Sequence, residues 1–101
     1  MACQYSNTAP DKERFTTYVC TQIKQLTGRS TVNSQTSFDS DTDDSGLGWD
    51  GEAVATIGNG IEARLDDNGC RVCPPIADSD YMKCGTVGDM IGLIWSRIQF
   101  T

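Results

Sequence analysis

The stretch Leu47-Gly48-Trp49-Asp50-Gly51 ends a long polar loop and leads into a segment with helical periodicity. Over residues 50–65, apolar side chains recur every three or four positions, at Val54, Ile57, Ile61 and Leu65. This spacing places them on one face and predicts an amphipathic helix. Gly58 and Gly60 each lower helix stability by about 1 kcal/mol relative to Ala. These glycines either admit another element at close range or mark a frayed part of the helix.

An earlier helix is predicted over residues 10–27. Its apolar residues recur at spacings of four, four and three, at Phe15, Val19, Ile23 and Leu26. Asp11 favours the N-terminus of this helix, and Gly28 is typical of the left-handed residue that ends a helix. Residues 1–9 are polar, and we expect them to form a disordered tail.

The C-terminal part of the chain predicts two more helices. Residues 78–83 favour one short helical turn, and Val72 lies in a short extended piece before it. Thr86 is predicted to cap the last helix, which runs to about Gln99, with Asp89 completing a capping box. The inward residues of this helix are Val87, Ile91, Ile94 and Ile98. The predicted fold is all-α: a small four-helix bundle over residues 10–101 with a long first loop and a short third helix.

That first loop, residues 29–49, is rich in Ser, Thr and Asp, with Phe38 as its clear apolar anchor. Loops of this length are uncommon in compact domains and are usually functional. Six of the fourteen acidic residues lie between Asp39 and Glu52. We therefore expect the loop and the helix start after it to form an acidic surface.

The length of 101 residues limits the possible architectures, and the net charge of −6 limits the possible partners. The chain is long enough for one domain with its own core. Nucleic acid is excluded as a partner because phosphate binding needs clustered Lys and Arg, whereas a protein with a basic surface is favoured. The sequence lacks an apolar run of about eighteen residues and a signal peptide. We therefore expect a cytoplasmic monomer that does not bind membranes.

Five cysteines are present, and histidine is absent. An odd number of cysteines without a secretory signal argues against a disulfide framework, so we expect reduced thiols. Cys70 and Cys73 form a CxxC pattern that is compatible with redox chemistry or with half of a zinc site. The sequence does not decide between these roles, and Cys20 is expected to pack on an apolar helix face.

The absence of histidine excludes a His-based catalytic triad and histidine metal ligands. The acidic residues lie in polar surroundings, where their carboxylates are expected to stay ionised. No phosphate-binding GxxxxGK[ST] motif occurs. The sequence therefore predicts no catalytic residues and a protein that is not an enzyme.

The order and spacing of these elements resemble an acyl carrier protein over residues 11–99. Such carriers open their second helix with Leu-Gly-x-Asp-Ser-Leu and their last helix with Thr-Val, and here the matching stretches are 47–51 and Thr86-Val87. Pro75-Ile76-Ala77-Asp78 is similar to the Ile-Pro-Asp before their third helix. The resemblance implies a fold in which a serine at the start of the second helix carries the phosphopantetheine arm.

Gly51 occupies the position of that serine, and Glu52 replaces the leucine after it. Glycine has no hydroxyl, so no phosphodiester forms there and no cofactor is expected. The chain resembles bacterial acyl-carrier-like proteins that lack the attachment serine, and we expect a protein-interaction module. The expected partner surface consists of Asp43, Asp44, Trp49, Asp50 and Glu52. An exposed Trp49 is typical of a binding hot spot, although it could equally cover the end of the bundle.

Two alternatives involve the same acidic loop. A genuine carrier of fatty-acid or polyketide type would need phosphopantetheine on Ser45, which lies six residues before Gly51. A calcium site would use positions one, three, five and twelve of an EF-hand-like loop, at Asp41, Asp43, Ser45 and Glu52. Gly48 at the eighth position departs from the aliphatic residue expected there, and no second such loop occurs to pair with it.

Overall fold

The computed structural model describes residues 3–38 and 47–100. Within these residues, four helices and one two-stranded sheet follow in the order α1 (Ala9–Thr27), α2 (Gly51–Asp67), β1 (Arg71–Val72), α3 (Asp78–Met82), α4 (Val87–Arg97) and β2 (Ile98–Gln99). A small, mostly helical fold with a short third helix was predicted and is confirmed. No helix of the described residues is both long and apolar enough to cross a membrane.

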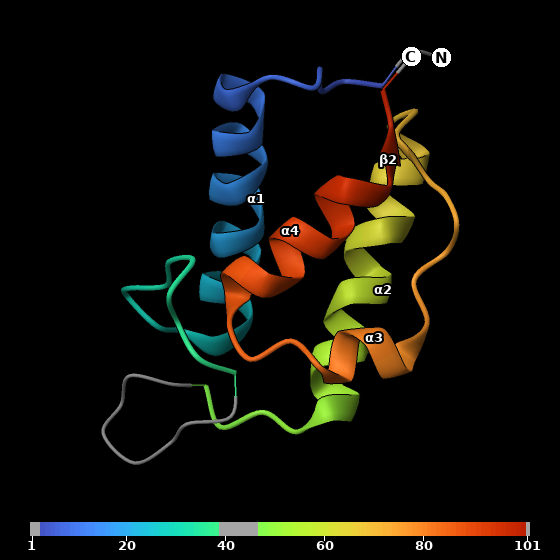
Figure 1. Ribbon diagram of the computed structural model, residues 1–101. Coiled ribbons are helices and arrows are strands. Elements are labelled where there is room, and N and C mark those ends of the chain that lie inside the picture. The colour runs from blue at the N-terminus through green and yellow to red at the C-terminus, as the bar shows by residue number, and fades with distance from the viewer. Residues whose placement is uncertain (1–2, 39–46, 101) are drawn as a thin grey trace.

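Figure 1 shows the arrangement of the helices. α1 runs down one side of the molecule, α2 runs up the other, and α4 crosses between them. The short α3 lies at the beginning of α2 (Figure 1). The two ends of the described chain meet at the end of the molecule opposite α3.

α1 follows the predicted bounds closely. The Thr8 hydroxyl caps its N-terminus by accepting from the backbone N–H of Asp11 at 3.3 Å. Gly28 ends it with a φ of 72° and donates its N–H to a carbonyl of the last turn, as predicted for a left-handed C-terminal residue. The predicted stripe is buried except at its end, where Leu26 is 63% exposed. The prediction that Leu26 faces inward is wrong. No described element covers its side chain, which borders a cavity between α1 and α2.

α2 begins one residue later and ends two residues later than predicted, and its buried face is shifted. Val54, Ile61 and Leu65 are buried as predicted, whereas Ile57 is only half-buried. Ala55 and Gly58 are buried as well. The shift arises because α3 packs on one side of α2, so the covered face is wider than a single apolar stripe.

Gly58 is the point where α3 packs most closely on α2. A Cβ atom at this position would lie 2.4 Å from a ring carbon of Tyr81. Tyr81 is fully buried, and its hydroxyl donates a hydrogen bond to the Glu62 carboxylate. Burial, reinforced by that carboxylate, raises the pKa of the Tyr81 phenol above its usual value. The prediction that a glycine admits a close neighbour is therefore confirmed at Gly58.

The predicted capping box of α4 is also confirmed. The Thr86 hydroxyl accepts from the backbone N–H of Asp89 at 3.2 Å, and the Asp89 carboxylate accepts from the Thr86 N–H at 3.2 Å. α4 ends at Arg97, two residues before the predicted end. Ile98 leaves the helix in an extended conformation and pairs with Val72 in the antiparallel sheet, although it is buried as predicted.

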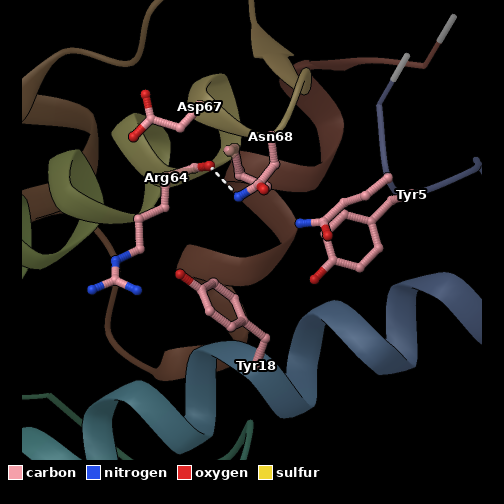
Figure 2. Close-up of a pocket in the computed structure, with 7 residues that line it drawn as sticks. Tyr5, Tyr18, Arg64, Asp67 and Asn68 are labelled. Atoms are coloured by element: carbon pink, nitrogen blue, oxygen red, sulfur yellow. Dashed lines mark hydrogen bonds between the residues drawn. The ribbon is translucent and has the colours of Figure 1, made fainter. Parts of the chain in front are cut away.

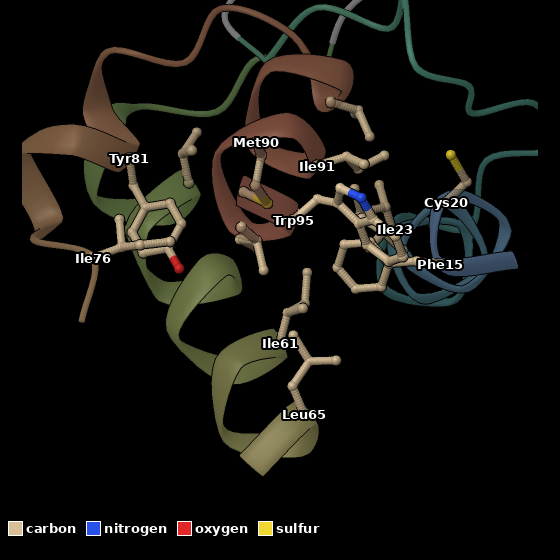
Figure 3. Packing of buried hydrophobic residues seen from close by; sticks show 14 of the residues in the cluster. Phe15, Cys20, Ile23, Ile61, Leu65, Ile76, Tyr81, Met90, Ile91 and Trp95 are labelled. Atoms are coloured by element: carbon tan, nitrogen blue, oxygen red, sulfur yellow. The ribbon is translucent and has the colours of Figure 1, made fainter. Parts of the chain in front are cut away.

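Aromatic rings form the centre of the core, where Phe15 of α1 meets Trp95 of α4 (Figure 3). Their ring centroids are 5.7 Å apart, and Tyr5 lies edge-on to both at 5.6 and 6.0 Å. Tyr5 is only 6% exposed. The structure thus differs from the expected disordered tail, because residues 3–8 pack on the bundle through this aromatic contact.

Cys3 and Cys70 are joined by a disulfide bond, while Cys20, Cys73 and Cys84 are free thiols. The expectation of five reduced thiols is therefore wrong. An odd number of cysteines does not exclude a single pair, and the pairing depends on residues 3–8 returning to the end of α2. The two cysteines of the CxxC pattern are not bonded to each other, since Cys70 pairs with Cys3 and Cys73 is a free, exposed thiol. Disulfides are typical of oxidising compartments, and the cytoplasmic location stays a prediction.

Loss of the disulfide is expected to lower the free energy of unfolding by about 4 kcal/mol, because it removes a cross-link between residues far apart in the chain. The bonded residues are separated by 67 positions. Urea denaturation of Cys3→Ser measures this loss, and the wild type in reductant should reproduce it. Cys73→Ser is the matched control, since it removes an exposed free thiol. Equal stability of the wild type with and without reductant would contradict the pairing.

A pair of glycine substitutions tests the packing of α3. Gly58→Ala is expected to lower the free energy of unfolding by about 1–3 kcal/mol, because its methyl group would overlap the Tyr81 ring. Gly60→Ala should raise it by up to about 1 kcal/mol, because nothing lies within 4 Å of a Cβ at that position. Urea denaturation compares the two variants. Changes of the same sign in the free energy of unfolding would contradict the close packing of Tyr81 on Gly58.

Candidate functional site

Phe38 connects the chain before α2 to the chain before α4. Its N–H donates to the Gly85 carbonyl at 2.9 Å, and its carbonyl accepts from the Trp49 N–H at 2.6 Å. The Phe38 side chain is 1% exposed, which confirms its predicted role as the anchor of the loop. The position of Trp49 is therefore set by backbone contacts on a buried residue.

The same loop holds the first turn of α4. The N–H of Val87 donates to the Thr36 carbonyl at 3.0 Å, and the N–H of Gly88 donates to the Ser34 carbonyl at 2.7 Å. A Cβ atom at Gly88 would lie 2.7 Å from that Ser34 oxygen. Residues 34–38 therefore form a hydrogen-bonded bridge between the starts of α2 and α4, where the sequence predicted a long loop without structure of its own.

Trp49 lies over the bridge and is half-buried. Its ring stacks on that of Phe38, with 5.9 Å between the centroids and 11° between the planes. Gly48, before it, has a φ of 67°, a conformation that glycine adopts without strain. Trp49 thus covers the side of the bundle with one face, and the rest of its surface reaches solvent at the beginning of α2.

Asp50 caps α2. Its carboxylate accepts from the backbone N–H of Ala53 at 2.9 Å, which satisfies one of the free donors at the helix N-terminus. Glu52, in the first turn, is also exposed and acidic. Both were predicted to belong to a partner surface, and the capping bond gives Asp50 a structural role as well.

Gly51, the first residue of α2, lies against Met82 of α3. A Cβ atom at position 51 would be 2.8 Å from the Met82 Cγ, so any larger residue requires this flexible side chain to move. Met82 is 48% exposed, which makes it one of two large exposed hydrophobic residues in the described part of the chain. Sequence reasoning missed Met82 because only the packing of α3 brings it to the beginning of α2.

We refer to Trp49, Asp50, Glu52 and Met82 together as the α2 entry surface. Backbone contacts, a helix cap and the packing of α3 hold these residues at one end of α2. The surface combines two carboxylates with apolar atoms, and it contains neither a nucleophilic side chain nor a basic one.

The other predicted site residues, Asp41, Asp43, Asp44 and Ser45, lie outside the described residues. Within residues 3–38 and 47–100, no three acidic or cysteine side chains are grouped so that they could hold a metal ion. Glu52 is described and exposed. The calcium alternative and the modification of Ser45 therefore stay predictions.

Comparisons with models of protein families, with curated proteins and with solved structures found no match. The resemblance to acyl carrier proteins consequently rests on the motifs at residues 47–51 and 86–87 and on the order of the helices.

Two substitutions of Asp50 separate its capping role from its charge. Asp50→Ala should lower the free energy of unfolding by about 1 kcal/mol, because Ala cannot accept the Ala53 hydrogen bond. Asp50→Asn should have little effect, since Asn is an equally good N-cap. Chemical denaturation measures both, with Glu52→Gln as a control that changes charge without touching the cap. Equal losses for the two Asp50 variants would exclude capping as the cause.

Proposed function

We propose that the protein is an acyl-carrier-like interaction module that carries no thioester cargo and binds a protein partner through the α2 entry surface. The observation that carries the proposal is the exposed Met82 beside two exposed acids at the helix start where the resemblance would place an attachment serine. Gly51 offers no hydroxyl at this place. The beginning of α2 can therefore contact a partner but cannot hold a phosphopantetheine arm.

The charge of this region supports a basic partner. Asp50 and Glu52 are both exposed, and no Lys or Arg occurs between Arg29 and Arg64. α3 contributes the exposed Asp78, while Lys83, directly after Met82, carries the opposite charge. A partner that presents Arg or Lys around an apolar centre would pair with the acids and cover Met82.

The stacking of Trp49 on Phe38 supports the same role. A side chain that is already held in place loses little conformational entropy on binding, and a half-buried Trp whose ring stacks on Phe38 is well suited to anchor an interface. The bridge of residues 34–38 thus holds Trp49 of the α2 entry surface through a backbone hydrogen bond and a stacked ring.

The intact mass of the protein purified from its source cells distinguishes the module from a carrier. We expect the mass of the unmodified chain. A gain that corresponds to phosphopantetheine, and that Ser45→Ala abolishes, would overturn the proposal and establish a carrier modified in the acidic loop.

Matched charge variants test the α2 entry surface. The double variant D50N/E52Q removes two charges and keeps an N-cap at position 50. D66N/D67N makes the same change of charge at the other end of the same helix, where both residues are exposed. Affinity purification with quantitative mass spectrometry should recover a partner about tenfold less with D50N/E52Q, but at wild-type level with D66N/D67N. Equal recovery with both variants would refute this surface.

A further inference from the structure

A trough runs between α1 and α2 and has two halves of different chemistry. One half is a cavity of about 540 Å³ that is lined mainly by polar residues, and the other is an apolar cavity of about 190 Å³. Both halves are lined by Tyr18 of α1 and Arg64 of α2. We refer to the whole as the α1–α2 trough.

The apolar half explains the exposure of Leu26. This residue is 63% exposed at the end of α1, and it lines the cavity with Ile57 and Ile61 across from it on α2. Ile57 is only half-buried although it lies on the predicted inward face. The bundle therefore leaves two large aliphatic side chains facing an unfilled space.

Gly60 lines the same half of the trough, and the packing of the chain does not account for it. Gly58 is required by Tyr81, but a Cβ atom at Gly60 would meet nothing within 4 Å. An alanine there would make a better helix. A glycine at such a place leaves the backbone open to the close approach of a ligand, and Gly60 lines the apolar half together with Leu26.

The polar half supplies a cation and several hydrogen-bond donors (Figure 2). The guanidinium of Arg64 forms no ion pair or hydrogen bond within residues 3–38 and 47–100. Figure 2 shows the Tyr18 ring rising from α1 into the space between the helices, with Tyr5 beside it. Asp67 also lines this half, but in Figure 2 its carboxylate and the Arg64 guanidinium project in different directions. Arg64 is thus available to a ligand.

From these contacts we infer that the α1–α2 trough binds a small amphiphilic anion. Its apolar body lies between Leu26, Ile57 and the backbone of Gly60. Its anionic group, a carboxylate, sulfonate or phosphate, binds the Arg64 guanidinium and accepts from the Tyr18 hydroxyl. The guanidinium suits such oxyanions because its donors match two oxygens at once.

A small molecule fits this trough better than a protein segment. The larger cavity, of about 540 Å³, lies within the range typical of small-molecule sites. The apolar half, of about 190 Å³, holds only the apolar part of such a molecule. The trough involves other residues than the α2 entry surface, so either site can fail without affecting the other.

Two fluorescent probes test the inference on the full-length protein with its disulfide intact. Anilinonaphthalene sulfonate carries an aromatic body and an anion, whereas phenylnaphthylamine has a similar body without charge. We expect saturable binding of the sulfonate at one site and weaker binding of the neutral probe. Amide chemical shifts in nuclear magnetic resonance spectra should change most around Tyr18, Gly60 and Arg64.

Arg64→Gln tests the anion contact. It should weaken the sulfonate about tenfold, the loss expected for one charge-assisted hydrogen bond, and leave the neutral probe unchanged. Lys12→Gln is the matched control, because it removes an exposed positive charge elsewhere on the protein and should affect neither probe. Equal effects of these two variants on the sulfonate would overturn the role of Arg64.

Gly60→Leu tests the apolar contact. The open space around position 60 lets the helix accept a side chain, and leucine favours helix, so the variant should fold with at least wild-type stability. Its side chain would fill the apolar half and weaken both probes at least about tenfold. Unchanged binding of both probes, or chemical-shift changes centred on Met82, would overturn the site.

Discussion

The structure depends on the backbone hydrogen bonds of Phe38. This residue donates to the chain before α4 and accepts from the chain before α2, while its buried ring supports Trp49. Buried backbone groups must find partners, and here each partner lies at the start of a different helix. Residues 34–38 therefore set where α2 and α4 begin relative to each other, and the position of the α2 entry surface follows.

α2 presents three surfaces to different neighbours. Its first turn is capped by Asp50 and borders Met82, its middle receives Tyr81 at Gly58, and another side faces α1 across the trough. Gly58 and Gly60, the two glycines in its middle, differ in their surroundings, since a neighbouring side chain covers only Gly58 of the two. Their cost in helix propensity is offset by packing at one position, whereas at the other the structure leaves an open space.

Many local features could be predicted from the sequence because they depend on neighbours within a few residues. The capping box of Thr86, the left-handed Gly28 and the buried stripe of α1 up to Ile23 are such features. The same reasoning failed at Leu26, because a helical period shows which residues share a face but not whether another element covers that face. For the candidate site, it identified Trp49, Asp50 and Glu52 but missed Met82, which comes from a distant segment.

The sequence by itself determined the helices, the helix ends at Gly28 and Thr86 and the absence of a hydroxyl at Gly51, since these follow from the chemistry of residues close together in the chain. Only the tertiary structure decided that Cys3 pairs with Cys70, that Tyr81 packs on Gly58 and that Met82 lies beside Gly51. It also placed Arg64 beside an open trough without an ion-pair partner among residues 3–38 and 47–100. These features require segments far apart in the chain to meet, and the helical period of each segment alone carries no information on how closely they approach.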